Sequence, residues 1–329
     1  MFQLIRPDTQ FDFVGKRHIW VSISGLAILA TVVLFFTKGL NYGIDFTGGA
    51  EVQLKVPAAW DIGKVRSELD NAGLKGLRVQ QIGEPSAHEF LVKAQGDESS
   101  LNRVSSQIDG ALAKLLQPKE YEIQRVDVVG PAAGSSLRIS GFLSMFYALL
   151  CILVYVTIRF DYRYSPGAVI ALFHDTVITL GVFILTQKQF DLQILAALLA
   201  LIGYSNNDTI IVYDRVRETV QNHPEMKIRD AVNRAINETL ARTILTSMTT
   251  FLTVFALWAL GGKVIQDFAF TLMVGLIVGS YSSIFVASAL VVWITEYQAK
   301  RAAKMAASPQ AKNRKNSPGA MRAQPKLQS

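Results

Sequence analysis

The sequence predicts an α-helical membrane protein with six transmembrane helices and one α+β domain outside the membrane. Half of its 329 residues are hydrophobic, and six apolar stretches are long enough to cross a bilayer as helices. A mixed segment of about a hundred residues, the size of one small domain, separates the first stretch from the second. The apolar stretches are residues 19–36, 142–158, 168–185, 192–212, 243–260 and 268–294.

The distribution of Lys and Arg predicts that both termini are cytoplasmic and that the large domain is external. The N-terminal arm, two alternate loops and the C-terminal tail hold 18 Lys and Arg residues, whereas the opposite short loops hold only Lys188 and Lys263. Such a basic excess marks the cytoplasmic side of membrane proteins. The net charge of +7 has the same origin, so it does not indicate nucleic-acid binding.

Residues 1–18 are expected to form a cytoplasmic arm, and residues 19–37 the first transmembrane helix. A cleaved signal peptide is the alternative, because a basic start before an apolar run is also its pattern. The late position and the length of the run favour an uncleaved helix. Three glycines follow it, at Gly43, Gly48 and Gly49, and they allow tight turns or close backbone contacts.

Residues 38–137 are expected to fold as the external domain. Apolar residues alternate in four of its segments, as in strands, and recur with helical spacing in two others. The resulting strand–helix–strand–strand–helix–strand order is that of a ferredoxin-like domain. Its segments are residues 50–56, 60–72, 77–82, 89–94, 99–116 and 121–129. The single Cys151 lies in the second apolar stretch, so the domain must fold without disulfides.

Residues 138–298 are expected to form a bundle of the second to sixth transmembrane helices. Gly130 and Pro131 lead into this bundle, either as a plain linker or as a hinge. Between the fourth and fifth helices, residues 219–238 are polar with apolar residues at helical spacing, which predicts an amphipathic helix along the cytoplasmic surface. Residues 299–329 are basic and rich in Ala, Gln and Pro, the composition of a disordered tail.

The fourth apolar stretch carries the first candidate functional residue, Asp208. A charged side chain at the centre of a membrane helix costs roughly 2.5–3.5 kcal/mol on insertion scales, so it is kept where a partner or a task compensates. Asn206 and Asn207 lie beside it as supporting hydrogen-bonding groups. A titrating acid and a hydrogen-bonded structural carboxylate are the two interpretations of Asp208.

Arg242 at the start of the fifth stretch lies within about one helical turn of Asp208 in depth, so a salt bridge or relay between them is allowed. Thr246, Thr249 and Thr253 extend its helix face as a polar stripe. The alternative is that the Arg242 side chain reaches back to water.

His174 and Asp175, inside the third stretch, are secondary candidates. They form either a structural hydrogen-bonded pair or a proton-handling pair. The sequence contains no Gly-x-x-x-x-Gly-Lys-Ser/Thr motif, and no catalytic, cofactor or metal-binding residues are expected in it. An ion gradient is therefore the expected energy source.

Taken together, these segments resemble the SecF branch of the SecD/SecF family, within the resistance-nodulation-division (RND) superfamily. The resemblance extends from Lys16 to about Glu296, and one departure is Asn206, where the family more often has an apolar residue. Its motifs here are residues 43–49, 129–131, 174–175, 203–209, 213–218 and 242–243.

The resemblance implies a six-helix half-transporter in the bacterial inner membrane, with a periplasmic domain between its first two helices. It implies pairing with SecD and assistance to the SecYEG channel in late preprotein export, driven by the proton gradient. YajC and YidC are further implied partners. By similarity, Asp208 and Arg242 match family positions implicated in proton passage. An exporter of small molecules or lipids and a non-conducting assembly scaffold are the two alternatives.

Overall fold

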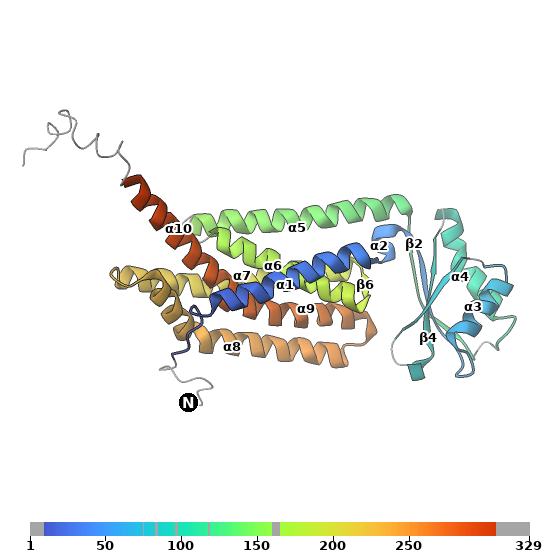
Figure 1. Cartoon of the computed structure of the whole chain (residues 1–329). Coiled ribbons are helices and arrows are strands. Elements are labelled where there is room, and N and C mark those ends of the chain that lie inside the picture. Colours follow the sequence, from blue (N-terminus) through green and yellow to red (C-terminus); the bar gives the residue numbers. More distant parts are fainter. Residues whose placement is uncertain are drawn as a thin grey trace, which may run out of the picture.

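The computed structural model describes residues 10–306, except residues 75, 83–84, 96–97, 118 and 160–164. Six helices in this part are long and apolar enough to cross a membrane, which confirms the six expected stretches. Five of them are α1 (Arg17–Thr37), α5 (Pro131–Arg159), α6 (Ser165–Thr186), α7 (Leu192–Asn222) and α8 (Ile228–Leu260). The sixth comprises α9 (Lys263–Ser282), a π-helical stretch (Ser283–Ala287) and α10 (Ser288–Ala306). The helices lie alongside one another, with a sheet domain at one end (Figure 1).

The sheet domain has the element order expected from the periodicity of its sequence. Its four strands pair antiparallel in the order β3-β4-β2-β5, with helices after the first and third strands in the chain. Both helices cover the face of the sheet that is turned away from the membrane helices (Figure 1). The elements are β2 (Gly49–Lys55), α3 (Ile62–Asn71), β3 (Arg78–Ile82), β4 (Glu89–Ala94), α4 (Glu98–Leu112) and β5 (Glu122–Val129).

The core of this domain lies between the sheet and its two helices. Leu54 and Phe90 from the strands are fully buried there, and Leu69 and Ile108 reach them from α3 and α4. The opposite sheet face is polar and is turned toward the membrane helices, because side chains alternate along a strand. The domain therefore folds around its own apolar core and presents polar side chains toward the helical bundle.

A short joint connects the domain to the bundle. Strand β1 (Asn41–Tyr42) pairs in parallel with β6 (Gln189–Phe190), which lies between α6 and α7. Helix α2 (Ile44–Thr47) follows β1 and packs beside α5. Gly134 belongs to α5 and touches the backbone of Gly48, where an added Cβ would lie 2.6 Å from the Gly48 nitrogen. Pro131 starts α5 at the position that needs no N–H partner, so this segment is helix rather than a flexible linker.

The separate amphipathic helix expected at about residues 219–238 is absent from the described chain. Instead, α7 continues to Asn222, and α8 begins at Ile228 and runs without a break into the membrane span. Arg215 bonds to Glu238 across the two helices, and Val232 and Ile236 are buried between them. The apolar residues of this segment do lie on one helix face, but that face packs against α7 and not along the cytoplasmic surface.

The N-terminal arm also docks on this helical hairpin. The side-chain amides of Asn233 and Asn237 in α8 each donate a hydrogen bond to the Phe11 carbonyl, at 2.9 Å. The Asn237 side-chain oxygen accepts a hydrogen bond from the Phe11 N–H. Val14 of the arm is buried together with Val232 and Ile236. Residues 299–306, expected to belong to a disordered tail, are helical instead, since α10 continues to Ala306. Residues 1–9, 160–164 and 307–329 lie outside the described part.

Candidate functional site

A polar cluster lies inside the bundle where α6, α7 and α9 meet, and Asp175 is at its centre. Ser205 of α7 donates to Asp175 Oδ2 at 2.5 Å, and Ser282 of α9 donates to the same oxygen at 2.8 Å. His174 Nδ1 lies 2.8 Å from the other oxygen, Oδ1. All four residues are almost fully buried. Both oxygens of the Asp175 carboxyl group therefore have hydrogen-bond partners, as buried polar atoms require.

Close helix packing makes this cluster possible. A Cβ at Gly279 would lie 3.0 Å from Ser205 Oγ and 3.7 Å from Asp175 Oδ2, so glycine lets α9 approach both. Immediately after Ser282 the helix widens into the π-helical stretch. Such single-turn π segments occur frequently at functional sites. Gly279 thus allows close packing of α9, which also brings Ser282 to Asp175.

Asp208 is just as buried as Asp175 but has fewer partners. Only 1% of its surface is exposed, and its single hydrogen bond in the described chain comes from Ser247 of α8, 3.2 Å from Oδ2. Ser280 of α9 donates in turn to Ser247 at 2.8 Å. Asp208 Oδ1 is buried without a hydrogen-bond partner among the described residues. A carboxylate in this state is costly when charged, and a proton on it would relieve that cost.

Arg242 lies near Asp208 without contacting it. The Arg242 charge acts on the carboxylate electrostatically, but no nitrogen–oxygen distance of 4.0 Å or less joins the two within the described chain. Its side chain is exposed on the outer face of α8, together with Thr249 and Thr253. The hydroxyl of Thr246 bonds to the Arg242 carbonyl. The polar stripe expected on this helix therefore exists, but it faces away from the rest of the described chain.

The two asparagines beside Asp208 differ in their surroundings. Asn206 is buried, with its carbonyl oxygen Oδ1 unpaired in the described chain, whereas Asn207 is exposed on α7. Neither amide forms a hydrogen bond with Asp208 in the part that the structure covers. Their expected role as hydrogen-bonding supports of Asp208 remains a prediction.

The joint with the sheet domain contacts the N-terminal end of α7, the helix that carries Asp208. Asp45 of α2 accepts the backbone N–H of Leu192, the first residue of α7, at 3.0 Å. The Gly43 N–H donates to the Phe190 carbonyl at 2.8 Å. Phe46 stacks on Phe190 with ring centroids 5.5 Å apart. Asp45 thus adds a second carboxylate to the start of α7, beside the N-cap residue Asp191, whose side chain accepts the Ile194 N–H.

Two models of known protein families match this chain, one over most of the helical bundle and one over the joint. A family model described as the C-terminal part of the protein export membrane proteins SecD/SecF matches residues 110–297, and a model of the SecD/SecF GG motif matches residues 33–56. This chain belongs to the SecD/SecF family. The GG motif contains the end of α1, β1, α2 and all of β2, so it includes the joint.

Individual relatives from the SecD/SecF family agree over most of their length. Protein translocase subunit SecF of Calditerrivibrio nitroreducens is 44% identical over 292 residues, covering 88% of this chain and 95% of the relative. SecF of Pseudomonas aeruginosa is 37% identical over 283 residues, covering 86% and 91%. The match to these subunits is therefore nearly end to end.

Two solved SecDF structures have the same fold in part of their chains. SecDF of Thermus thermophilus, titled a translocon-associated membrane protein, superposes with a TM-score of 0.81 at 35% identity. The match covers 90% of this chain but 40% of that one. A second SecDF structure gives a TM-score of 0.66 at 37% identity, covering 92% and 41%. This chain thus spans about two-fifths of each solved SecDF chain.

We expect Asp45→Ala in the GG motif to loosen the joint of this SecD/SecF chain while leaving the bundle folded. The Leu192 N–H would lose its acceptor at a helix N-terminus, a loss of about 1 kcal/mol. Hydrogen exchange should then quicken in the first turn of α7 and in β6. The matched control is Asp61→Ala, which removes the cap of α3 inside the sheet domain. Equal protection of the α7 start in both variants would contradict the capping role of Asp45.

The sequence did not indicate the four serines around the two buried aspartates. Ser205 and Ser282 bond to Asp175, Ser247 bonds to Asp208, and Ser280 bonds to Ser247. A serine in a membrane helix satisfies its hydroxyl on the preceding turn, so its presence alone marks no site. The only usable signal was position, because Ser205 lies three residues before Asp208 on the same helix face. Their contacts depend on how the helices pack, which the sequence of one helix does not reveal.

Proposed function

We propose that this chain is an accessory subunit of the Sec protein-export translocase, which pairs with SecD and uses the proton gradient to promote late preprotein translocation. The observation that carries the proposal is the buried Asp208 carboxylate, with an oxygen that no described residue satisfies. The end-to-end similarity to SecF subunits supports the translocase context. The proposed surroundings include the SecYEG channel, with YajC and YidC as further partners.

The proposal includes an orientation and a domain type. Both termini are cytoplasmic and the sheet domain is periplasmic in the bacterial inner membrane, because the basic residues of short loops lie at the end opposite to the sheet domain. The described chain starts and ends at that same end (Figure 1). Strand order β3-β4-β2-β5 with two helices on one face supports a ferredoxin-like domain. Six helices of this type make one half of an RND-type transporter.

The surface proposed for SecD lies on α7 and α8, which pack against each other. On α7, Ala200, Gly203 and Asn207 are exposed, and nothing lies within 4 Å of a Cβ placed at Gly203. Small residues of this kind let two membrane helices approach closely. Arg242 on α8 would then be covered by SecD, which explains an exposed guanidinium in the spanning part of a helix.

In the proposed cycle, Asp208 alternates between a charged and a protonated state, with Arg242 and the Ser247–Ser280 pair as its surroundings. Charge on Asp208 favours contact with Arg242, and protonation releases it. Moving one charge through the membrane potential supplies about 2.3 kcal/mol per 100 mV. The change passes along α7 to Asp45, which bonds to the first residue of that helix, and so to the periplasmic domain.

Reconstitution in vesicles tests the proposal. Vesicles holding SecYEG, SecA and this chain are compared with and without SecD, and both proton uptake and preprotein release are measured. We expect an imposed proton gradient to speed release only when SecD is present. Release that follows a sodium gradient instead would assign a different driving ion. Efflux of dye or lipid without release would favour an exporter, and no effect on either would favour a scaffold.

A further inference from the structure

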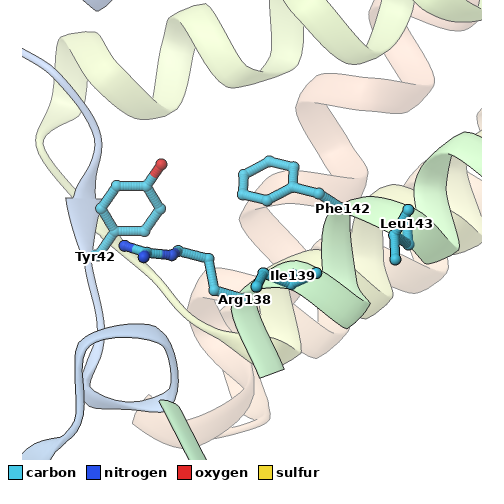
Figure 2. Close-up of a pocket in the computed structure, with 5 residues that line it drawn as sticks. All are labelled: Tyr42, Arg138, Ile139, Phe142 and Leu143. Atoms are coloured by element: carbon cyan, nitrogen blue, oxygen red, sulfur yellow. The ribbon is translucent and has the colours of Figure 1, made fainter. Parts of the chain in front are cut away.

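A pocket of about 500 Å³ lies between β1 of the joint and the N-terminal part of α5, away from the buried carboxylates. Its lining residues are Tyr42 from β1 and Arg138, Ile139, Phe142 and Leu143 from α5. Figure 2 shows the Arg138 side chain extending toward the Tyr42 ring, with Phe142 projecting beside the same space. One charged group thus borders an otherwise apolar hollow.

The depth of Arg138 in the bundle can be fixed from its neighbours. Gly141, one turn further along α5, packs on Leu195 in the first turn of α7. Arg138 lies about 4.5 Å nearer to the sheet domain than Gly141, since a helix rises 1.5 Å per residue. It is therefore level with the start of α7 at Leu192. Leu192 begins the fourth apolar stretch, so we place Arg138 at the edge of the hydrocarbon core, where lipid phosphates are expected.

The charge of Arg138 has no counterion among the residues that the structure describes. The side chain is exposed, and no ion pair or hydrogen bond to it occurs among the described residues. A guanidinium matches a phosphate through paired hydrogen bonds, better than a lysine does. An aromatic residue such as Tyr42 suits the same depth, because its ring is apolar and its hydroxyl is polar.

The apolar part of the pocket continues toward the membrane centre. Ile139 is 61% exposed, Phe142 42% and Leu143 46%. All three follow Arg138 along α5, in the direction away from the sheet domain. An acyl chain attached to a phosphate on Arg138 would lie against these side chains. Burial of apolar area contributes roughly 25 cal/mol per Å². A soluble anion would leave this surface uncovered.

We infer that Arg138, Tyr42 and the apolar residues Ile139, Phe142 and Leu143 form a binding site for one anionic phospholipid of the leaflet next to the sheet domain. The phosphate lies on the Arg138 guanidinium, and one acyl chain lies along α5. The site adjoins the GG-motif joint through Tyr42, which pairs with Phe190 at the start of α7. It is independent of proton passage and of export.

Native mass spectrometry of the purified full chain in detergent tests this site. Phosphatidylglycerol and phosphatidylcholine are titrated in turn, and the lipid retained per chain is measured. We expect wild type to retain phosphatidylglycerol preferentially and R138Q to retain about tenfold less of it, since a charge-assisted pair is lost. R138K should lose an intermediate amount, because it keeps the charge without the paired geometry.

The matched control is K38Q, which removes an exposed cation after the outer end of α1, outside the pocket. Its retention should equal that of wild type. F142S should weaken retention of both lipids while leaving the preference for phosphatidylglycerol. Unchanged retention in R138Q, an equal loss in K38Q, or displacement of the lipid by millimolar inorganic phosphate would each overturn the assignment.

Discussion

We expect Asp208→Asn to abolish the stimulation of preprotein release by a proton gradient, in vesicles that contain SecD, SecYEG and SecA. Asparagine has nearly the shape of aspartate and can still accept the Ser247 hydroxyl. It cannot carry the negative charge or take up and release a proton, so the variant removes the titration and nearly keeps the shape of the side chain. Release with the gradient should fall to the rate seen without it, while release driven by SecA alone stays unchanged.

The matched control for this variant is Asp214→Asn, on the same helix. Asp214 is exposed and pairs with Arg159 at the surface, at 3.4 Å. Its neutralisation should leave gradient-dependent release intact, because exposed ion pairs contribute little. Both variants must insert and co-purify with SecD to the same extent. A normal response to the gradient in D208N would rule out Asp208 as the titrating group.

The sequence predicted the elements of this fold well, because its periodicities are strong. Long apolar runs specify the spans, and alternation in residues 50–56 specifies β2, with Val52 and Leu54 inward. It failed at residues 219–238, where an amphipathic face suits lipid and a neighbouring helix equally. The choice was made by contacts between α7 and α8, such as Arg215 with Glu238, that no local pattern contains.

The candidate site was predictable only in part, for a related reason. Asp208 and Asp175 stand out in sequence because a carboxylate in an apolar run is costly. Their different surroundings do not stand out. Asp175 receives hydrogen bonds from three residues, whereas Asp208 receives one, and this contrast arises from the approach of α9 at Gly279. We propose from this contrast that Asp175 mainly holds the helices together and that Asp208 titrates.

That assignment makes a second prediction, for the stability of the bundle. Asp175→Ala should lower the free energy of unfolding by about 2–4 kcal/mol, because His174 and Ser205 would each lose the acceptor of a buried hydrogen bond and Ser282 would keep only its bond to the Gly279 carbonyl. Unfolding in mixed micelles by added dodecyl sulfate measures this loss. Asp214→Ala is the control at an exposed aspartate, with an expected loss below about 0.5 kcal/mol.

The conservative variant Asp175→Asn separates structure from proton handling. The asparagine oxygen can still accept from Ser205 and Ser282, so most of the stability should return. Gradient-dependent release should then persist, since in this view Asp175 need not change its protonation during the cycle. If D175N folded normally but lost its response to the gradient as completely as D208N, both carboxylates would belong to one proton path. The serines of α9, which reach Asp175 directly and Asp208 through Ser247, would be its connection.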